Sequence, residues 1–297
     1  MEKIDELDKS DILKIIESAA NFKCDNNRSD NLKGYIFGLL FFEPSTRTSM
    51  SFESAIYRLG GNVIKYNSQY SSEKKGESLE DTIRTIDSYI DVFIIRHPEK
   101  NIISKIKKVT NKPIINAGDG DGEHPTQAML DLFTIMEYYP KLPDKIAFTG
   151  DLKYSRTVNS LVSLLKKISS SFNKNIEYYF VSDKLLTPSI NILRGINYKV
   201  ISDSSIKEVI DIIDVLYVTR LQKERYFDEN VQINIETIDS KLISSCKNNL
   251  IIMHPLPRNQ ELSTDLDNNE KSKYFEQVEN GVFVRMAILN HVIKQFV

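Results

Sequence analysis

Short apolar runs of strand length alternate with amphipathic helical stretches along almost the whole chain. The candidate strands cover residues 35–42, 62–66, 91–96, 113–116, 145–149, 176–181, 198–201, 214–218 and 249–253. The helical patterns lie near 46–59, 78–90, 99–109, 124–139, 155–169, 187–195, 205–212 and 239–246, and an earlier helix begins with Ser10 as N-cap. Strands that alternate with helices of this length form βαβ units, so the pattern predicts parallel sheets with helices on both faces.

The chain of 297 residues is long enough for two domains, and nine strands fit either one wide sheet or two smaller ones. The helical pattern of residues 124–139 ends at Pro140, and the alternation resumes at Lys145. We therefore expect a first domain over residues 1–139 and a second over 140–280, with the amphipathic stretch 281–297 packing back on the first. The expected fold class is α/β, with two doubly wound parallel-sheet domains and the active site in the cleft between them.

Composition excludes several classes of protein. Thirty-nine Lys and Arg stand against 41 Asp and Glu, and a net charge of −2 argues against bulk nucleic-acid binding. The longest apolar run, residues 35–42, is too short to span a membrane, and the acidic start of the chain has no apolar core of a signal peptide. We expect a cytoplasmic protein without a membrane segment. Cys24 and Cys246 cannot form a disulfide framework and lack metal-ligand spacing, so both are expected to be buried, inert thiols.

The most informative motif follows the first strand directly and reads Phe-Phe-Glu-Pro-Ser-Thr-Arg-Thr over residues 41–48. A helix that begins there offers unpaired backbone N–H groups, hydroxyls and the Arg47 guanidinium, which together suit a phosphate. The motif is not a Walker A loop, which disfavours nucleotide hydrolysis. The alternative is an ordinary helix start with Ser45 as N-cap and Arg47 in solvent.

Other polar motifs also follow predicted strands. Each has an ordinary structural interpretation, such as a solvated charge run for Lys74-Lys75-Gly76-Glu77, a surface Arg96 or a structural His124. Their shared position at the ligand-binding ends of parallel strands is what favours a site. The motifs are Lys-Lys-Gly-Glu at 74–77, Arg-His-Pro at 96–98, His-Pro-Thr-Gln at 124–127, Arg156, Thr-Arg-Leu-Gln at 219–222, and His-Pro-Leu-Pro-Arg at 254–258.

Taken together and in this order, the motifs resemble those of the transcarbamoylase family, over nearly the whole chain. Within the family the chain resembles the catalytic chains that use aspartate. Pro255 follows His254 where ornithine-specific members typically place Cys, and no Ser-Met-Gly sequence of an ornithine loop occurs. Residues 219–225 resemble a loop that binds the carboxylate of aspartate, and a cationic pocket would repel cationic ornithine.

The resemblance implies transfer of a carbamoyl group from carbamoyl phosphate to the amino group of L-aspartate, giving N-carbamoyl-L-aspartate and phosphate in pyrimidine biosynthesis. It implies no metal and no organic cofactor. By resemblance, the residues that bind carbamoyl phosphate are Ser45, Thr46, Arg47, Thr48, Ser71, Lys75, Arg96, His124, Gln127, Leu256 and Pro257. Those that bind aspartate are Lys75, Arg156, Arg220 and Gln222, and those closest to catalysis are Arg47, Thr48, Lys75, Arg96 and His124.

Ser71 and Lys75 resemble residues that the family donates to a neighbouring subunit's site, which implies a homotrimer with shared active sites. Two other functions stay open on the residues alone. One is a transcarbamoylase with a different amine acceptor, and the other is a catalytically silent interaction subunit on the same fold. The sequence does not tell whether regulatory chains or nucleotides bind.

Overall fold

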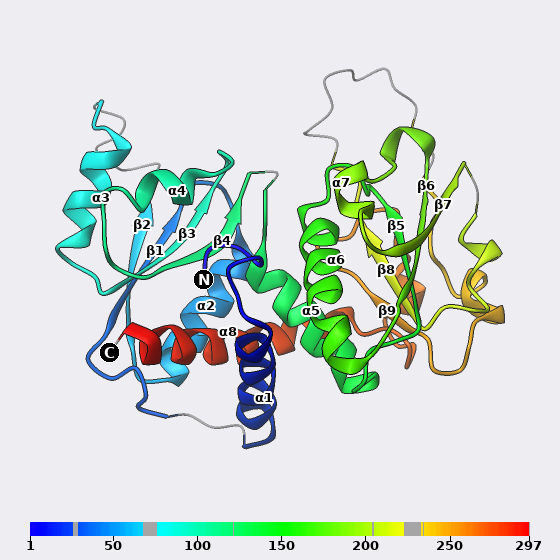
Figure 1. Cartoon of the computed structure of the whole chain (residues 1–297), viewed down its shortest axis with the longest axis horizontal. Coiled ribbons are helices and arrows are strands. Elements are labelled where there is room, and N and C mark those ends of the chain that lie inside the picture. Colours follow the sequence, from blue (N-terminus) through cyan, green and yellow to red (C-terminus); the bar gives the residue numbers. More distant parts are fainter. Residues whose placement is uncertain are drawn as a thin grey trace. The chain divides into compact units, whose positions relative to one another are not determined.

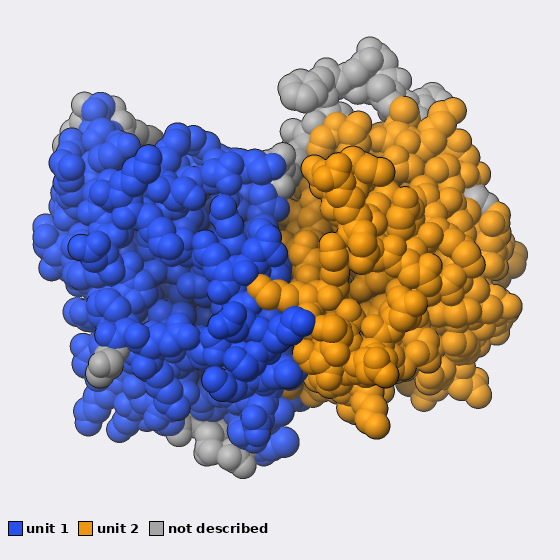
Figure 2. All heavy atoms as spheres, in the orientation of Figure 1, with its two compact units in different colours: residues 1–130, 279–297 blue, residues 131–278 orange. Residues whose placement is uncertain are grey.

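The structure, a computed structural model, describes residues 1–25, 29–67, 76–120, 122–203, 205–222, 233 and 235–296. It divides into two compact units, Met1–Leu130 with Glu279–Val297 and Asp131–Val278 (Figure 2). The chain passes from one unit to the other twice, each time within a helix: first in α5 (Pro125–Tyr138) and then in α8 (Tyr274–Phe296). The unit that holds both chain ends is called unit 1 below, and the other unit 2.

Unit 1 is built around a parallel four-stranded sheet in the order β2-β1-β3-β4. Its strands are β1 (Ile36–Phe41), β2 (Asn62–Asn67), β3 (Val92–His97) and β4 (Ile114–Asp119). Its helices, besides parts of α5 and α8, are α1 (Lys9–Asp25), α2 (Thr46–Arg58), α3 (Leu79–Asp87) and α4 (Ile102–Ile106). The register pairs Phe41 with Arg96, so β1 and β3 end side by side.

Helices cover both faces of this sheet. On one face, α3 and α4 bury Ile83 and Ile103 against Leu40 and Phe93 of the strands. Figure 1 shows α2 and α8 on the other side of the sheet. Apolar side chains on both faces of a strand explain the nearly continuous hydrophobic runs in the sequence.

Unit 2 holds a parallel five-stranded sheet in the order β7-β6-β5-β8-β9. Its strands are β5 (Lys145–Gly150), β6 (Glu177–Ser182), β7 (Asn197–Ser202), β8 (Val215–Thr219) and β9 (Ile251–Met253). Its helices, besides parts of α5 and α8, are α6 (Arg156–Ser169) and α7 (Ile190–Leu193). Short 3-10 turns make up much of the remaining cover, at 170–172, 184–186, 206–208, 242–245 and 264–266.

The two faces of the unit 2 sheet are packed differently. One face is aliphatic, with Leu216, Val218 and Ile252 packed on the segments around the 3-10 turns. The other carries a row of aromatic rings, in which Phe148 lies 5.4 Å from Phe180 and 5.7 Å from Tyr217 between ring centroids. Tyr217 is fully buried in this row.

The expected α/β class with two parallel-sheet domains is confirmed, and each of the nine predicted strands is present. Two predicted helices are wrong, because residues 205–212 and 239–246 contain only the short 3-10 turns Ile206–Glu208 and Leu242–Ser245. The apolar residues of both segments are spaced as in a helix and are buried. A single 3-10 turn is enough to bury them, so no longer helix forms. The last helix begins at Tyr274 rather than near residue 281, since both Tyr274 and Gln277 are buried.

The cysteine expectation is also wrong in part. Cys24 is exposed on α1, and Cys246 is only partly buried. Burial nonetheless raises the pKa of the Cys246 thiol, which keeps it protonated. Among the helices that the structure describes, none is long and apolar enough to cross a membrane.

A glycine is required where β5 and β8 end. Gly150 has φ +99°, and a Cβ placed on it would lie 1.9 Å from the carbonyl oxygen of Thr219. We expect Gly150→Ala to lower the free energy of unfolding, measured by denaturant titration, because the residue meets both strain and a backbone clash. Gly34→Ala is a matched control, since Gly34 has φ +89° but no atom within 4 Å of the added Cβ.

The free energy of unfolding of the Gly34→Ala control should fall only by the cost of the left-handed conformation, about 1–2 kcal/mol. Gly150→Ala should lose a further amount of about 1–3 kcal/mol from the clash. Equal losses in the two variants would contradict the close approach of Gly150 to Thr219.

Candidate functional site

The first group of predicted site residues lies where β1 ends and α2 begins. Ser45 is the N-cap residue of α2, and among the described residues its side chain accepts no capping hydrogen bond. Thr46 and Arg47 are exposed, whereas Thr48 is buried, and the described first turn contains no acidic side chain. Ser45 thus holds the expected cap position without using its hydroxyl there, and the helix start keeps the character of an anion site.

Arg96 reaches the same place from β3. Its Nε lies 2.7 Å from Oε1 of Glu43, and its carbonyl oxygen accepts a hydrogen bond of 2.8 Å from the Phe42 N–H. The carboxylate of Glu43 therefore compensates the charge of Arg96 before any ligand is present. An incoming dianion would compete with that carboxylate for the guanidinium.

His124 and Gln127 lie at the start of α5, after β4. Both side chains are buried, with 4% and 8% of their surface exposed. The preceding loop is fixed by Asp119, whose Oδ1 accepts from the Glu123 N–H at 2.8 Å, and by a bond of 2.8 Å from the Gly120 N–H to the His97 carbonyl. Because β3 and β4 are neighbours, the loop of His124 begins beside the end of Arg96's strand.

Glu123 ties this loop to the first residues of the chain. Its Oε2 accepts a hydrogen bond of 2.8 Å from the Ile4 N–H. Burial raises the pKa of the Glu123 carboxyl above its ordinary value, although the bond from Ile4 opposes that shift. The residue before His124 is therefore held by a long-range contact.

Ser71 and Lys75 lie outside the described residues, so their predicted roles rest on the sequence alone.

The two arginines of unit 2 follow neighbouring central strands. Arg156 is the first residue of α6 after β5, with 9% of its surface exposed, and Arg220 directly follows β8. Residues Gly150 and Thr219 are paired at the ends of these strands. The fold thus places both guanidinium-bearing residues at one edge of the sheet, where two carboxylates of one ligand could be bound.

Asp151 fixes the loops that carry these arginines. It is fully buried, and its Oδ2 accepts a hydrogen bond of 3.1 Å from the Gln222 N–H while Oδ1 accepts one of 3.0 Å from the Tyr154 N–H. The hydroxyl of Thr219 donates to the carbonyl of Asp151 at 3.2 Å. The backbone of Gln222 is therefore held to the loop that precedes Arg156.

The loop of Leu256 and Pro257 follows β9, next to β8. The Leu256 N–H donates to Nδ1 of His254 at 2.8 Å, and Nε2 of the same ring lies 2.9 Å from Oε1 of Glu261. Because Nδ1 accepts, Nε2 carries the proton and donates to Glu261. Burial opposes ionisation of Glu261, but its hydrogen bonds with His254 and the Asn259 N–H outweigh burial and lower its pKa.

Leu256 itself has φ 53°, a conformation that is strained for a leucine. Arg258 closes the loop, with Nη2 2.7 Å from Oδ2 of Asp267. This contact holds the pKa of Asp267 near 2. Arg258 is thus engaged within the protein, whereas the backbone of Leu256 is held in an imposed conformation.

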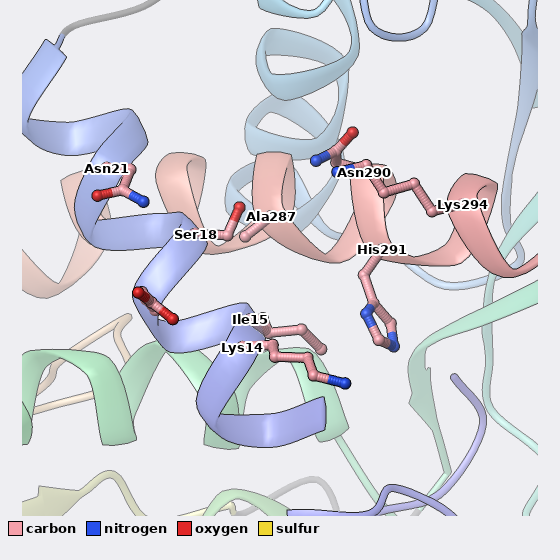
Figure 3. Close-up of a pocket in the computed structure, with 9 residues that line it drawn as sticks. Lys14, Ile15, Ser18, Asn21, Ala287, Asn290, His291 and Lys294 are labelled. Carbon is pink, nitrogen blue, oxygen red and sulfur yellow. The ribbon is translucent and has the colours of Figure 1, made fainter. Parts of the chain in front are cut away.

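A cavity of about 310 Å³ in unit 1 lies elsewhere. Side chains of α1 and α8 line it, among them Lys14, His291 and Lys294 (Figure 3). None of the described residues that line it belongs to the predicted site.

Sequence reasoning missed two carboxylates that contact the site segments, Glu43 and Asp151. Both follow a strand within a cationic motif, and an acidic residue in that position is a signal that could have identified them. Their partners could not be assigned from spacing alone.

Comparison with protein families gives two matches that together cover most of the chain. Residues 1–137 match the model described as aspartate/ornithine carbamoyltransferase, carbamoyl-P binding domain. Residues 144–292 match the model of the Asp/Orn binding domain of the same family.

Curated relatives are similar over nearly their whole length. The aspartate carbamoyltransferase catalytic subunit of Methanobrevibacter smithii is 45% identical, over 98% of this chain and 93% of the relative. The protein of the same name from Photobacterium profundum is 42% identical, over 98% and 96%.

Solved structures of aspartate transcarbamoylase from Trypanosoma cruzi have the same fold. The complex with carbamoyl aspartate and phosphate matches with a TM-score of 0.88 and 39% identity, over 98% of this chain and 94% of the other. The complex with carbamoyl phosphate matches with a TM-score of 0.90 and 38% identity, over 98% and 95%.

The histidine in the α1–α8 cavity generates a prediction about stability. Burial lowers the pKa of His291 below its ordinary value of 6.5, while the nearby Asp11 opposes the shift and Lys14 and Lys294 add to it. The unfolded chain therefore takes up a proton at His291 more readily, and stability is lost as the pH falls below about 6.5. We expect His291→Gln to lose less stability than the wild type between about pH 7.5 and 5.5 in urea titrations. An identical loss in both proteins would contradict this.

Proposed function

Because this chain belongs to the aspartate/ornithine carbamoyltransferase family, we propose that it transfers the carbamoyl group of carbamoyl phosphate to L-aspartate. The products are N-carbamoyl-L-aspartate and phosphate, a step of pyrimidine biosynthesis. The amine nitrogen forms a bond to the carbonyl carbon, the bond from that carbon to the phosphate oxygen breaks, and the amine loses a proton.

The observation that carries the choice of acceptor is the placement of Arg156 and Arg220 after neighbouring strands of unit 2. Two guanidinium groups at one sheet edge match the two carboxylates of aspartate. They would repel the cationic side chain of ornithine, the other acceptor named in the family's description. The relatives named as catalytic subunits for aspartate support the same choice.

We propose the following roles for the residues of unit 1. Ser45, Thr46, Arg47 and Thr48 hold the phosphate at the start of α2. Thr48, Arg96 and His124 donate to the carbonyl oxygen, which gains negative charge in the tetrahedral intermediate, and Gln127 accepts from the carbamoyl NH₂. A preorganised donor of this kind contributes about 2.7–4 kcal/mol to the stability of the transition state.

In unit 2, Arg156, Arg220 and Gln222 bind aspartate, and the backbone of Leu256 and Pro257 contacts the carbamoyl amine and the nucleophile. Residues 1–139 with 281–297 accordingly serve as a carbamoyl-phosphate domain and 140–280 as an aspartate domain. Together with Lys75 of a neighbouring subunit, the site has five cationic groups for two substrates that each carry about two negative charges. That the protein works in the cytoplasm is part of the same proposal.

The function is tested by measuring products from carbamoyl phosphate with aspartate and, in parallel, with ornithine. We expect carbamoyl-aspartate alone. Arg156→Gln should raise the KM for aspartate far more than the KM for carbamoyl phosphate, because it removes a carboxylate partner only. Product from ornithine alone would move the assignment to the other acceptor, and no product from either would favour a silent subunit.

The sharing of sites in a homotrimer has its own test. An Arg47→Ala chain and a Lys75→Ala chain should each be nearly inactive, and mixing them should restore partial activity from sites that contain neither change. Subunit exchange is verified by mass spectrometry of the mixed oligomer. Mixed oligomers without recovered activity would contradict sharing.

A further inference from the structure

A buried row of polar side chains in unit 2 is centred on Asp131 of α5. Asp131 is fully buried. Its Oδ2 accepts a hydrogen bond of 2.7 Å from the Tyr217 hydroxyl on β8, and its Oδ1 accepts one of 2.5 Å from the Gln277 side-chain amide on α8. The mechanism above uses none of these three side chains.

One arm of the row leads to the two arginines. Tyr217 lies on β8, three residues before Arg220, and its hydroxyl is also hydrogen-bonded to Thr157, the residue after Arg156. Thr157 in turn lies 3.0 Å from the hydroxyl of Ser155, the N-cap of α6. The residues on both sides of Arg156 are thus connected, through the Tyr217 hydroxyl, to the strand that directly precedes Arg220.

The other arm leads to the loop of Leu256. The side-chain carbonyl oxygen of Gln277 accepts a hydrogen bond of 3.1 Å from the His254 N–H, and the His254 ring accepts the Leu256 N–H. His254, Gln277 and Asp131 all expose 1% of their surface or less. The strained backbone of Leu256 therefore depends on a path that ends at the same carboxylate.

The directions of these hydrogen bonds require a carboxylate at position 131. The amide of Gln277 must present its oxygen to the His254 N–H, so its NH₂ faces Asp131, while the Tyr217 hydroxyl donates to the other oxygen. Position 131 must accept on both sides, which a carboxylate does and an asparagine cannot. An asparagine there would put two NH₂ groups in contact, or would force Gln277 to turn away from His254.

From this arrangement we propose that Asp131 is a positioning residue for the aspartate half of the site. It holds Arg156 and Arg220 through Tyr217, and it holds Leu256 through Gln277 and His254. The inference rests on the proposed function, because it assigns these three residues to aspartate and the carbamoyl group. Asp131 does not touch substrate; it fixes the relative position of the groups that do, and a displacement of about 1 Å in such groups can cost about 100-fold in rate.

The decisive variants exchange the charge between two positions. Asp131→Asn and Gln277→Glu should each lower kcat/KM for aspartate by about 100-fold. In the first variant two donors meet, and in the second two carboxylates meet. The double variant Asp131→Asn/Gln277→Glu restores the polarity, since the new asparagine accepts from Tyr217 and donates to the new glutamate, which accepts from the His254 N–H. We expect the double variant to regain at least about tenfold over either single variant at unchanged net charge.

Tyr217→Phe gives a milder test, should the charged variants fold poorly. It removes one bond to Asp131 and keeps the ring in the aromatic row, so the KM for aspartate should rise while the KM for carbamoyl phosphate stays nearly constant. Tyr178→Phe is the matched control, because Tyr178 is a buried tyrosine on β6 whose ring stacks on Phe180 in the same aromatic row. It should leave both constants unchanged.

Asp214→Asn separates positioning from stability. Asp214 is also a buried carboxylate that accepts backbone N–H groups, from Asp144 and Lys145, but it precedes β8 and so lies at the opposite end of that strand from Arg220. We expect this control to lower the unfolding midpoint without changing the KM for aspartate. A loss of stability in the Asp131 and Tyr217 variants with unchanged kinetic constants, or no gain in the double variant, would overturn the proposal.

A binding measurement keeps the two hypotheses apart. Succinate, a four-carbon dicarboxylate without an amine, is titrated calorimetrically into each variant in the presence of phosphate. Weakened succinate binding in Asp131→Asn, with recovery in the double variant, supports positioning even if turnover fails. Absence of turnover by the wild type with either amine counts against the proposed function, and succinate binding that is equal in wild type and Asp131→Asn counts against the positioning role.

Discussion

The parallel register of the strands is the constraint on which the rest of the structure depends. Hydrogen bonds between neighbouring backbones force β1, β3 and β4 to end together in unit 1, and β5, β8 and β9 to end together in unit 2. Of the predicted site residues that the structure describes, Arg96 lies at the end of β3, and all the others lie in segments that follow one of these strands. Within each unit, the register of the strands therefore brings together candidate site residues that are far apart in the sequence.

Several cationic side chains lie at the carboxyl ends of these strands, and their mutual repulsion is offset by nearby carboxylates. Glu43 compensates Arg96, while Asp151 takes up N–H groups of the loops around Arg156 and Arg220. The net charge of the whole chain is −2, so these positive groups are not part of an overall positive excess. The Arg96 guanidinium is thus held by a carboxylate of its own unit, and the loops around Arg156 and Arg220 are held by another, which preorganises both candidate segments.

The sequence predicted the strands and the motifs after them because both are local signals. Nine apolar runs and the polar residues that end them can be read without knowing any contact. The 3-10 turns at residues 206–208 and 242–245 escaped prediction because apolar spacing reports burial and not the length of a helix. The start of α8 was missed for a related reason. Gln277 is buried although it is polar, so a pattern of apolar residues does not mark its position as part of the helix.

Asp131 escaped for a different reason. Its partners Tyr217 and Gln277 are 86 and 146 residues away along the chain, and no local pattern marks such a pair. The matched hydrogen-bond directions of Asp131 and Gln277 also constrain how the two positions can evolve. A lineage that changes one residue passes through a mismatched intermediate before it reaches the exchanged pair. The two positions are therefore coupled, and across descendants of this chain they should vary together or stay fixed together.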